Sequence, residues 1–230
     1  IPIVNPDGVI NGNYRCSLCG QDLNRRWKTP NKVLHPVVFA VKRLMRSFAK
    51  EREIVMFTDL HGHSRKKNIF MYGNNIKEAP QTTRVFPYIL SKICDFFSFE
   101  QSRFSLSKAK EGTARIAMYR ELNIPNIFTM EASFCGADKG EYADSHFTTE
   151  AYMHAGQCLL EAIIVFFNIQ IRSSKEGEPP SPLQKFNAKE LEQELTANKK
   201  LINMTMGEEG NSSGSESEPS ADNLDEEEMA

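Results

Sequence analysis

The sequence predicts an α/β fold, on the basis of apolar runs and helical periodicity that alternate along the chain. Three short apolar runs, Ile54–Thr58, Ile69–Gly73 and Pro125–Met130, have the composition of buried strands. Two longer segments, Val33–Glu53 and Thr148–Ile169, place apolar residues at i, i+3 and i+4, as helices on a core do. The first run directly follows a helix, which favours a buried strand of an α/β sheet.

The chain opens with residues expected to end a buried strand, Ile1–Val4, followed by a long loop, Asn5–Trp27. The loop begins with Asn5-Pro6-Asp7-Gly8, in which proline presets its φ angle, aspartate can bond its own backbone and glycine tolerates positive φ. Gly12 and Gly20 are expected to interrupt any regular element before Trp27.

The same loop carries a concentration of cationic side chains that needs an anion to offset their repulsion: Arg15, Arg25 and Arg26, with Asn24 beside them. A guanidinium matches a carboxylate with two parallel donors, and an adjacent asparagine adds a neutral donor and acceptor. The loop therefore suggests a carboxylate-binding site. The alternative is a solvated loop whose arginines pair with Asp7 and Asp22.

Length and composition limit the class of protein. The 230 residues allow one domain with an appendage, and no apolar run reaches the ~18 residues of a membrane span. No signal peptide is recognised, and five cysteines without one indicate a reducing compartment. Cys16 and Cys19 form a CxxC pair, but no second pair follows at a zinc-ribbon spacing, so we interpret them as ordinary thiols.

The net charge of −2 hides an asymmetry between the body of the chain and its end. Residues 207–230 hold nine Asp and Glu and no Lys or Arg, so residues 1–206 hold 28 basic and 21 acidic side chains, a balance of +7. A basic body suits an anionic partner, and no nucleic-acid motif is present. We expect a domain over 1–170, a linker with a weak helix over 171–206, and a disordered acidic tail over 207–230.

Two predicted strands lead into polar residues that could carry chemistry. Ile54–Thr58 is followed by Asp59, His61 and His63, and open α/β sheets place their sites at the carboxyl ends of strands. Either histidine is a candidate metal ligand, with Asp59 orienting it, and the alternative is a hydrogen-bonded core histidine. The third strand delivers Glu131, which we interpret as a metal ligand, a general base or half of an ion pair.

The remaining segments carry weaker signals. Thr83–Phe97 is expected to be a helix, Ser98–Thr113 a connection, and Ala114–Leu122 a short helix or strand. His146 and His154 lie at or near the final helix and are interpreted as structural.

Three stretches, in this order along the chain, together resemble one known family: NPDG…GNxR…GxDLNRxW, then DLHGHS, then FTMEASFCG. They look like the cytosolic carboxypeptidases of the metallocarboxypeptidase superfamily, zinc enzymes that remove glutamates from tubulin tails. The resemblance covers Ile3 to Asn168, about 70% of the chain. It implies a partial mixed-sheet α/β/α metallocarboxypeptidase domain, located in the cytosol, with the centriole or cilium base as a further expected location.

The resemblance also implies roles for particular residues. Arg15 matches the arginine that polarises the scissile carbonyl and stabilises the oxyanion. Asn24 and Arg25 match the pair that grips the terminal carboxylate of the substrate. His61 matches a zinc ligand, with His63 as the alternative, and Glu131 matches the general base that takes a proton from zinc-bound water.

Two further residues are candidates near the substrate. Substrates of this family end in glutamate, so a basic specificity pocket is expected, and Arg115 is the candidate for it. A tyrosine acts near the substrate in related carboxypeptidases, and Tyr119 is nearby but matches no motif.

One departure from the family pattern concerns the metal. The family's other two zinc ligands lie in an HxxE motif upstream of the NPDG loop, and this sequence contains no HxxE. A catalytic zinc normally has three protein ligands. With a first residue other than Met, the chain is expected to be a fragment or truncated isoform.

Three functions therefore stay open. The first is a zinc carboxypeptidase that acts on polyglutamylated tubulin or other acidic C-terminal tails. The second is a non-catalytic module that binds such tails through Arg15, Asn24 and Arg25. The third treats His61-Gly62-His63 as the HxH of a metal amidohydrolase barrel, which would need more βα repeats than this chain holds. Neither nucleic acid nor membrane is expected as a partner.

Overall fold

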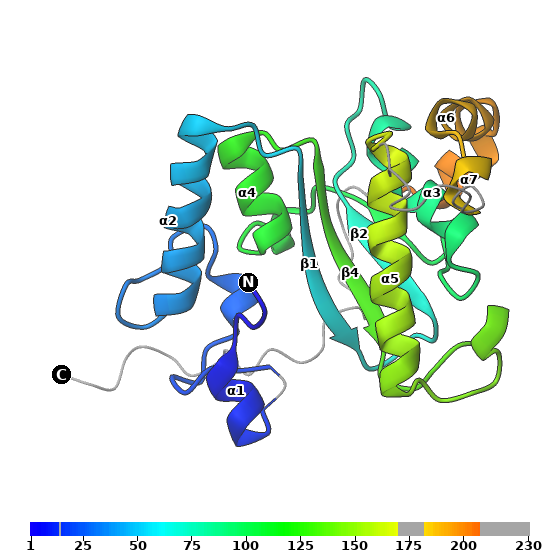
Figure 1. Ribbon diagram of the computed structural model, residues 1–230. Helices are drawn as coiled ribbons and strands as arrows, with labels where there is room; N and C mark the ends of the chain where they lie inside the picture. The colour runs from blue at the N-terminus through cyan, green and yellow to red at the C-terminus, as the bar shows by residue number, and fades with distance from the viewer. Residues whose placement is uncertain (14, 170–181, 208–230) are drawn as a thin grey trace, which may run out of the picture.

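The computed structural model describes residues 1–13, 15–169 and 182–207. A mixed four-stranded sheet, in the order β1-β4-β2-β3, forms its middle layer (Figure 1). β1 (Met56–His63) runs parallel to β4 (Asn126–Ser133), which pairs antiparallel with β2 (Ile69–Gly73). β3 (Arg103–Phe104) runs parallel to β2. The predicted α/β fold with a partial mixed sheet is confirmed.

Helices cover both faces of the sheet, which gives three layers (Figure 1). α2 (Pro36–Glu51) and α4 (Ala114–Leu122) lie on one face. α3 (Val85–Ile93) and α5 (Thr149–Phe166) lie on the other. Short 3₁₀ helices occur at Leu23–Arg25, Thr82–Arg84, Lys108–Lys110, Gly140–Tyr142 and Pro182–Lys185, labelled η1 to η5.

The alternation of side chains along the strands decides which face carries the polar residues. Ile127 packs in the core cluster with α2 and α4, whereas Phe128 packs in the cluster with α3 and α5. Because side chains two residues apart share a face, Glu131 lies on the same face as Ile127. On β1, Phe57 packs toward α2 and α4 in the same way, and His61 shares its face. Both polar side chains therefore belong to one face of the sheet.

The predicted helices are confirmed, with shorter bounds than expected. α2 begins at Pro36, where the missing backbone N–H is harmless, and α5 is capped by Thr148, whose side chain accepts a hydrogen bond from the backbone of Ala151. The ambiguous segment Ala114–Leu122 is a helix. α3 occupies the middle of the expected helix Thr83–Phe97.

Three expectations about the first half of the chain are wrong. Ile1–Val4 is not a strand. The NPDG turn is instead the start of a helix, α1 (Pro6–Asn11), because the side chain of Asn5 accepts a hydrogen bond from the N–H of Gly8. The first predicted strand does not end at Thr58 but continues to His63. It continues because its whole length pairs with β4, which the local sequence does not reveal.

The segment expected to be a linker with a weak helix carries two helices that pack on the core. α6 (Ala188–Ala197) and α7 (Lys199–Met204) lie beside α3 (Figure 1). Leu195 is fully buried there, and the hydroxyl of Tyr88 on α3 donates to Oε1 of Glu194 at 2.6 Å. Residues 170–181 of the expected linker and 208–230 of the expected tail lie outside the described residues.

We expect Leu195→Ala to lower the free energy of unfolding by about 2–5 kcal/mol, because it empties a fully buried site between α6 and α3. Urea unfolding measures this loss. The control is Leu160→Ala, the same substitution at a side chain that is 63% exposed, for which we expect about 0.5 kcal/mol or less. Equal losses in the two variants would show that α6 is not part of the cooperative core.

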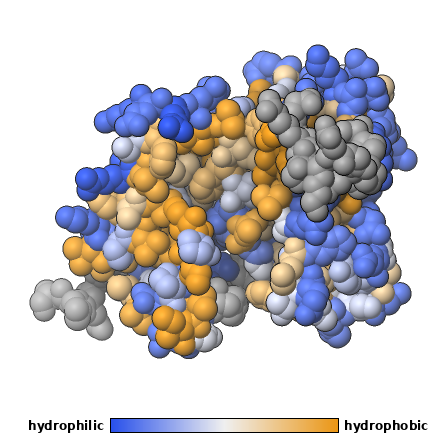
Figure 2. Space-filling model, viewed as in Figure 1, coloured by the Kyte–Doolittle hydropathy of each residue, from blue (hydrophilic) through white to orange (hydrophobic). Residues whose placement is uncertain are grey.

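Apolar side chains are exposed beside the outer strand β1. Large apolar residues with exposed side chains include Val9 and Ile10 of α1, Leu44 and Phe48 of α2, and Leu60 of β1. Figure 2 shows apolar surface over the half of this face that carries α1, α2 and β1. No helix among the described residues has the length and apolar character to cross a membrane.

Candidate active site

His61 and Glu131 face each other across the pair β1 and β4. They are register partners in the parallel ladder, and His61 Nδ1 lies 4.0 Å from Glu131 Oε1. The other ring nitrogen of His61, Nε2, lies 2.7 Å from Asp59 Oδ2. A carboxylate that accepts the Nε2 proton fixes the tautomer in which Nδ1 carries a lone pair. The arrangement thus directs a ligand nitrogen and a carboxylate toward the same point.

The environment of His61 is buried and negatively charged. Burial alone would lower the pKa of His61, but the hydrogen bond and charge of Asp59, with the charges of Glu131 and Asp22, outweigh it and raise the pKa. Glu131 itself is 8% exposed. Because Asp22 belongs to the arginine-bearing loop, its influence on His61 indicates that this loop lies close to the strand ends.

His63 is held differently, although it shares the face of His61. Its Nδ1 accepts hydrogen bonds from the backbone N–H groups of Arg65 and Lys66, each at 3.1 Å, and its ring packs edge-on against Phe70. The Nδ1 lone pair of His63 is therefore engaged in a turn. Each histidine thus has one engaged ring nitrogen, and His61 is the one that lies opposite Glu131 in the strand register.

The loop arginines pair with Asp22, as the solvated-loop alternative expects. Arg15 Nη2 lies 3.2 Å from Asp22 Oδ2, and Arg25 Nη1 lies 3.9 Å from the same oxygen. Both side chains stay about one third exposed, at 35% and 33%. An ion pair with Asp22 and binding of a further carboxylate are compatible, because one carboxylate does not neutralise two guanidiniums.

Asn24 and Arg25 are fixed by the segment that leads into α4. Asn24 Oδ1 accepts a hydrogen bond from the N–H of Ala114 at 2.9 Å, and the N–H of Trp27 donates to the carbonyl of Gly112 at 2.9 Å. Gly112 lies so close that a Cβ on it would come within 2.3 Å of the Arg25 carbonyl oxygen. Among the described residues the amide NH₂ of Asn24 has no partner, so it is the group that a ligand would meet.

Arg115, the candidate for a specificity pocket, is deeply buried at the carboxyl end of β2. Its Nη1 donates to the carbonyls of Gly73 and Ser105, at 2.6 and 2.8 Å, and to Oδ1 of Asn74 at 2.6 Å. Burial lowers the pKa of Arg115 to about 10, so it stays protonated near neutral pH. Tyr119, by contrast, packs in the core cluster of α2 and α4.

Two lysines, Lys66 and Lys110, lie near these residues although the sequence does not indicate it. Lys66 places its ammonium 5.0 Å from the ring centre of Phe70 and 5.8 Å from that of Tyr72, on the face that carries Glu131. Lys110 lies in η3 with Arg25 and Arg115 near its charge. In the sequence both lysines belong to polar, basic turns, and tertiary packing alone distinguishes them from solvated residues.

The residues present fit one ligand position of a zinc site. His61 is oriented for a metal by Asp59, in the arrangement common around zinc. Within residues 1–13, 15–169 and 182–207, however, no three His, Cys, Asp or Glu side chains form a group that could hold a metal ion. A zinc ion beside His61 would therefore need ligands from outside the described residues.

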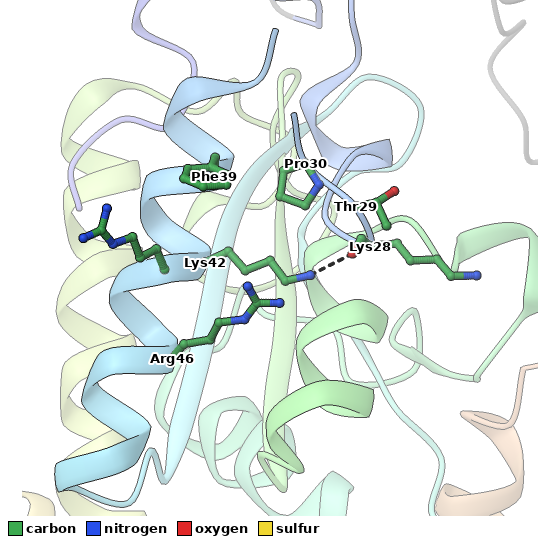
Figure 3. Close-up of a pocket in the computed structure, with 7 residues that line it drawn as sticks. Lys28, Thr29, Pro30, Phe39, Lys42 and Arg46 are labelled. Atoms are coloured by element: carbon green, nitrogen blue, oxygen red, sulfur yellow. Dashed lines mark hydrogen bonds between the residues drawn. The ribbon is translucent and has the colours of Figure 1, made fainter. Parts of the chain in front are cut away.

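A separate cavity of about 360 Å³ lies between α2 and the segment that follows Trp27 (Figure 3). It is lined by Lys28, Thr29, Pro30, Phe39, Lys42, Arg43 and Arg46. The ammonium of Lys42 is buried and donates to the carbonyls of Trp27 and Lys28, and it pairs with Glu121 at 2.9 Å. Because this cation is already satisfied, it anchors the end of the arginine-bearing loop and is not available to a ligand.

Replacing Glu121 by glutamine is expected to cost about 1–3 kcal/mol of folding stability at neutral pH, because buried Lys42 loses its carboxylate. Burial tends to raise the pKa of Glu121, but its hydrogen bonds with Arg46 and Lys42 lower it overall. The carboxylate therefore stabilises the fold above its unfolded pKa of about 4.3, and this is lost as the pH falls through the folded value.

Urea unfolding at several pH values checks both points. The difference between the wild type and Glu121→Gln should shrink as the pH falls below about 4. Glu192→Gln, at an exposed position of α6, is the matched control and should change little at any pH. A pH-independent difference would mean that the ion pair with Lys42 does not contribute.

The fold is that of the metallocarboxypeptidases. A solved metallo-carboxypeptidase from Pseudomonas aeruginosa matches 73% of this chain and 45% of its own, with a TM-score of 0.63 and 24% identity. No family model matches the sequence.

The particular relatives are the cytosolic carboxypeptidases, and the chain is homologous to a segment of them. It is 45% identical over 169 residues to cytosolic carboxypeptidase 2 of Mus musculus, covering 72% of this chain and 20% of that protein. It is 36% identical over 223 residues to cytosolic carboxypeptidase 1 of Danio rerio, covering 89% of this chain and 19% of that protein. The chain thus spans about a fifth of the length of these relatives.

Proposed function

We propose that this chain is the part of a zinc carboxypeptidase that binds the substrate terminus and supplies the general base. The substrates would be acidic C-terminal tails that end in glutamate, such as polyglutamylated tubulin. The pairing of His61 with Glu131 across β1 and β4, beside the arginine-bearing loop, is the observation that carries this proposal.

In this proposal each side chain acts at a defined atom of the substrate. Arg25 and the amide of Asn24 bind the terminal carboxylate, and Arg15 donates to the oxygen of the scissile carbonyl as it gains negative charge. Glu131 takes a proton from the attacking water and returns it to the leaving amine. Zinc, when bound, would lower the pKa of that water toward neutrality.

Specificity for glutamate would come from cations at the base of the site. Arg115 is buried, protonated and held by three oxygens, so it provides a fixed positive field. Lys66, packed on Phe70 and Tyr72, and the half-buried Lys110 would add further positive charge. The names of the relatives support a location in the cytosol. A location at the centriole or the base of the cilium is a further expectation from the resemblance.

The test compares this chain with a longer version of the protein that carries an upstream HxxE motif. Zinc content and release of glutamate from a polyglutamate-tailed peptide are measured for both. The proposal expects zinc and cleavage in the longer version. A longer version that holds no zinc and cleaves nothing would refute it.

The second candidate is a module that binds acidic tails without cutting them. The absence of a complete metal-binding group within the described residues favours it for this chain in isolation. It predicts peptide binding through Arg25 that chelators leave unchanged, in both the short and the longer version.

A further inference from the structure

Four cations from three segments converge beside the proposed carboxylate site: Arg15, Arg25, Lys110 and Arg115, here called the cationic cluster. The convergence is built by backbone contacts, since Gly112 touches the Arg25 carbonyl and Ala114 bonds to Asn24. The same packing half-buries Lys110. Its pKa is lowered, first by burial and then by the charges of Arg25, Arg15 and Arg115. Asp22 offsets part of this positive charge, since it pairs with Arg15 and Arg25, and a bound anion would relieve the remainder.

The C-terminal end of the described chain leads to this cluster. The N–H of Phe104 donates to the carbonyl of Thr205 at 2.9 Å, and the N–H of Gly207 donates to the carbonyl of Phe104 at 3.1 Å. Arg84, fully buried, fixes this end by donating from Nε to Oγ1 of Thr205 at 2.8 Å. Residues 205–207 therefore run alongside β3 as an added edge.

Gly207 lies close to Arg115, because Ser105 is in contact with both. A Cβ on Gly207 would lie 2.7 Å from Cβ of Ser105, and the carbonyl of Ser105 accepts the hydrogen bond from Arg115. The next residues in the sequence are Glu208 and Glu209. The acidic segment of the sequence is therefore attached to the described chain at a residue, Gly207, that lies close to Arg115.

We propose that the acidic segment 208–230 binds the cationic cluster of its own chain and competes there with acidic peptides. The segment carries nine carboxylates and no Lys or Arg, so its charge is complementary to the cluster. Its attachment at Gly207 gives it an effective concentration in the millimolar range at the cluster. The inference rests on the proposed function, because the same cations are proposed to receive the substrate.

The experiment uses the full chain and a variant in which the nine Asp and Glu of residues 208–230 become Asn and Gln. None of the described residues changes, so the packed core stays intact. A fluorescent oligoglutamate peptide with a free carboxyl end is titrated into each protein at about 20 mM salt, where screening is weak. We expect the neutralised variant to bind about tenfold more tightly, because its segment no longer competes.

Two further measurements test whether the difference in peptide affinity arises at the cationic cluster. Lys110→Gln should weaken peptide binding and reduce the advantage of the neutralised variant, and Lys189→Gln, at an exposed site on α6, should change neither. At about 0.5 M salt the difference between the two full chains should largely disappear.

The outcomes separate the two proposals. Equal peptide affinity of the wild type and the neutralised variant at low salt would overturn the competition by segment 208–230 and leave the proposed function standing. Failure of both proteins to bind the peptide would refute the carboxylate site itself, and the inference would fall with it.

Discussion

Glu131→Gln is expected to lower kcat for glutamate release by about 10²–10⁴-fold, in a version of the protein that holds zinc. Glutamine keeps the size of the side chain and a carbonyl oxygen near His61, but it cannot take a proton from water. KM should change little, because proton transfer acts in the transition state rather than in substrate binding. Steady-state kinetics on a polyglutamate-tailed peptide measures both constants.

The matched control is Glu51→Gln, at the exposed end of α2, for which kcat should equal that of the wild type. Zinc content distinguishes loss of the base from loss of the metal, since Glu131→Gln should keep the metal while losing turnover. A variant that retains more than half of the wild-type kcat would exclude Glu131 as the general base.

The parts of the fold that the sequence predicts are those with a local physical signature. β2 and β4 are buried on both faces, so their apolar runs stand out against polar neighbours, whereas β1 is a partly exposed edge strand and not the buried strand that its apolar run predicts. α2 and α5 each bury one stripe of side chains, which gives the helical spacing. Their order along the chain therefore predicts the layered architecture.

Two features depend on distant contacts, the strand β3 and the packing of α6 on the core, and the sequence does not predict them for a corresponding reason. β3 is two residues long and exists because Phe104 pairs with β2 and with Met206, which follows α7. α6 is mostly polar, and its placement depends on Leu195 entering a core built by α3. β3 has no signal within its own segment, and the weak helical pattern of α6 does not reveal that the helix packs on the core.

The residues of the candidate site likewise fall into those that the sequence indicates and those that it does not. Asp59, His61 and Glu131 are recognisable because polar residues at the ends of apolar strands are costly unless they have a role. Their alignment follows from register, which brings His61 opposite Glu131. Lys66 and Lys110 carry no such signal, since a lysine in a polar turn is ordinarily solvated, and the fold alone places them near the site.

Arg25→Gln is expected to weaken binding of a peptide with a free C-terminal carboxylate by about 2 kcal/mol or more, about thirtyfold in Kd. The planar guanidinium can donate two parallel hydrogen bonds to a carboxylate, and its position is set by Asn24 and Gly112 rather than by the ligand. Fluorescence titration of this chain, without metal, measures the effect, because carboxylate recognition does not require zinc.

The same peptide with a C-terminal carboxamide separates recognition of the terminus from general attraction of charge. The wild type should prefer the carboxylate form, and Arg25→Gln should bind the two forms almost equally. Arg25→Lys keeps the charge but loses the paired donors, so it should recover little of the preference.

Arg43→Gln is the matched control, because Arg43 is an exposed arginine of α2 at the separate cavity and its loss changes the net charge by the same amount. If Arg43→Gln weakened binding as much as Arg25→Gln, the basic body as a whole would attract the peptide. If Arg25→Gln alone removed the preference for a free carboxylate, the loop would act as a directional receptor for a chain terminus. An exopeptidase site must recognise the terminus of its substrate, whereas a surface that binds acidic tails needs only positive charge. A preference for the free carboxylate therefore distinguishes the two kinds of site.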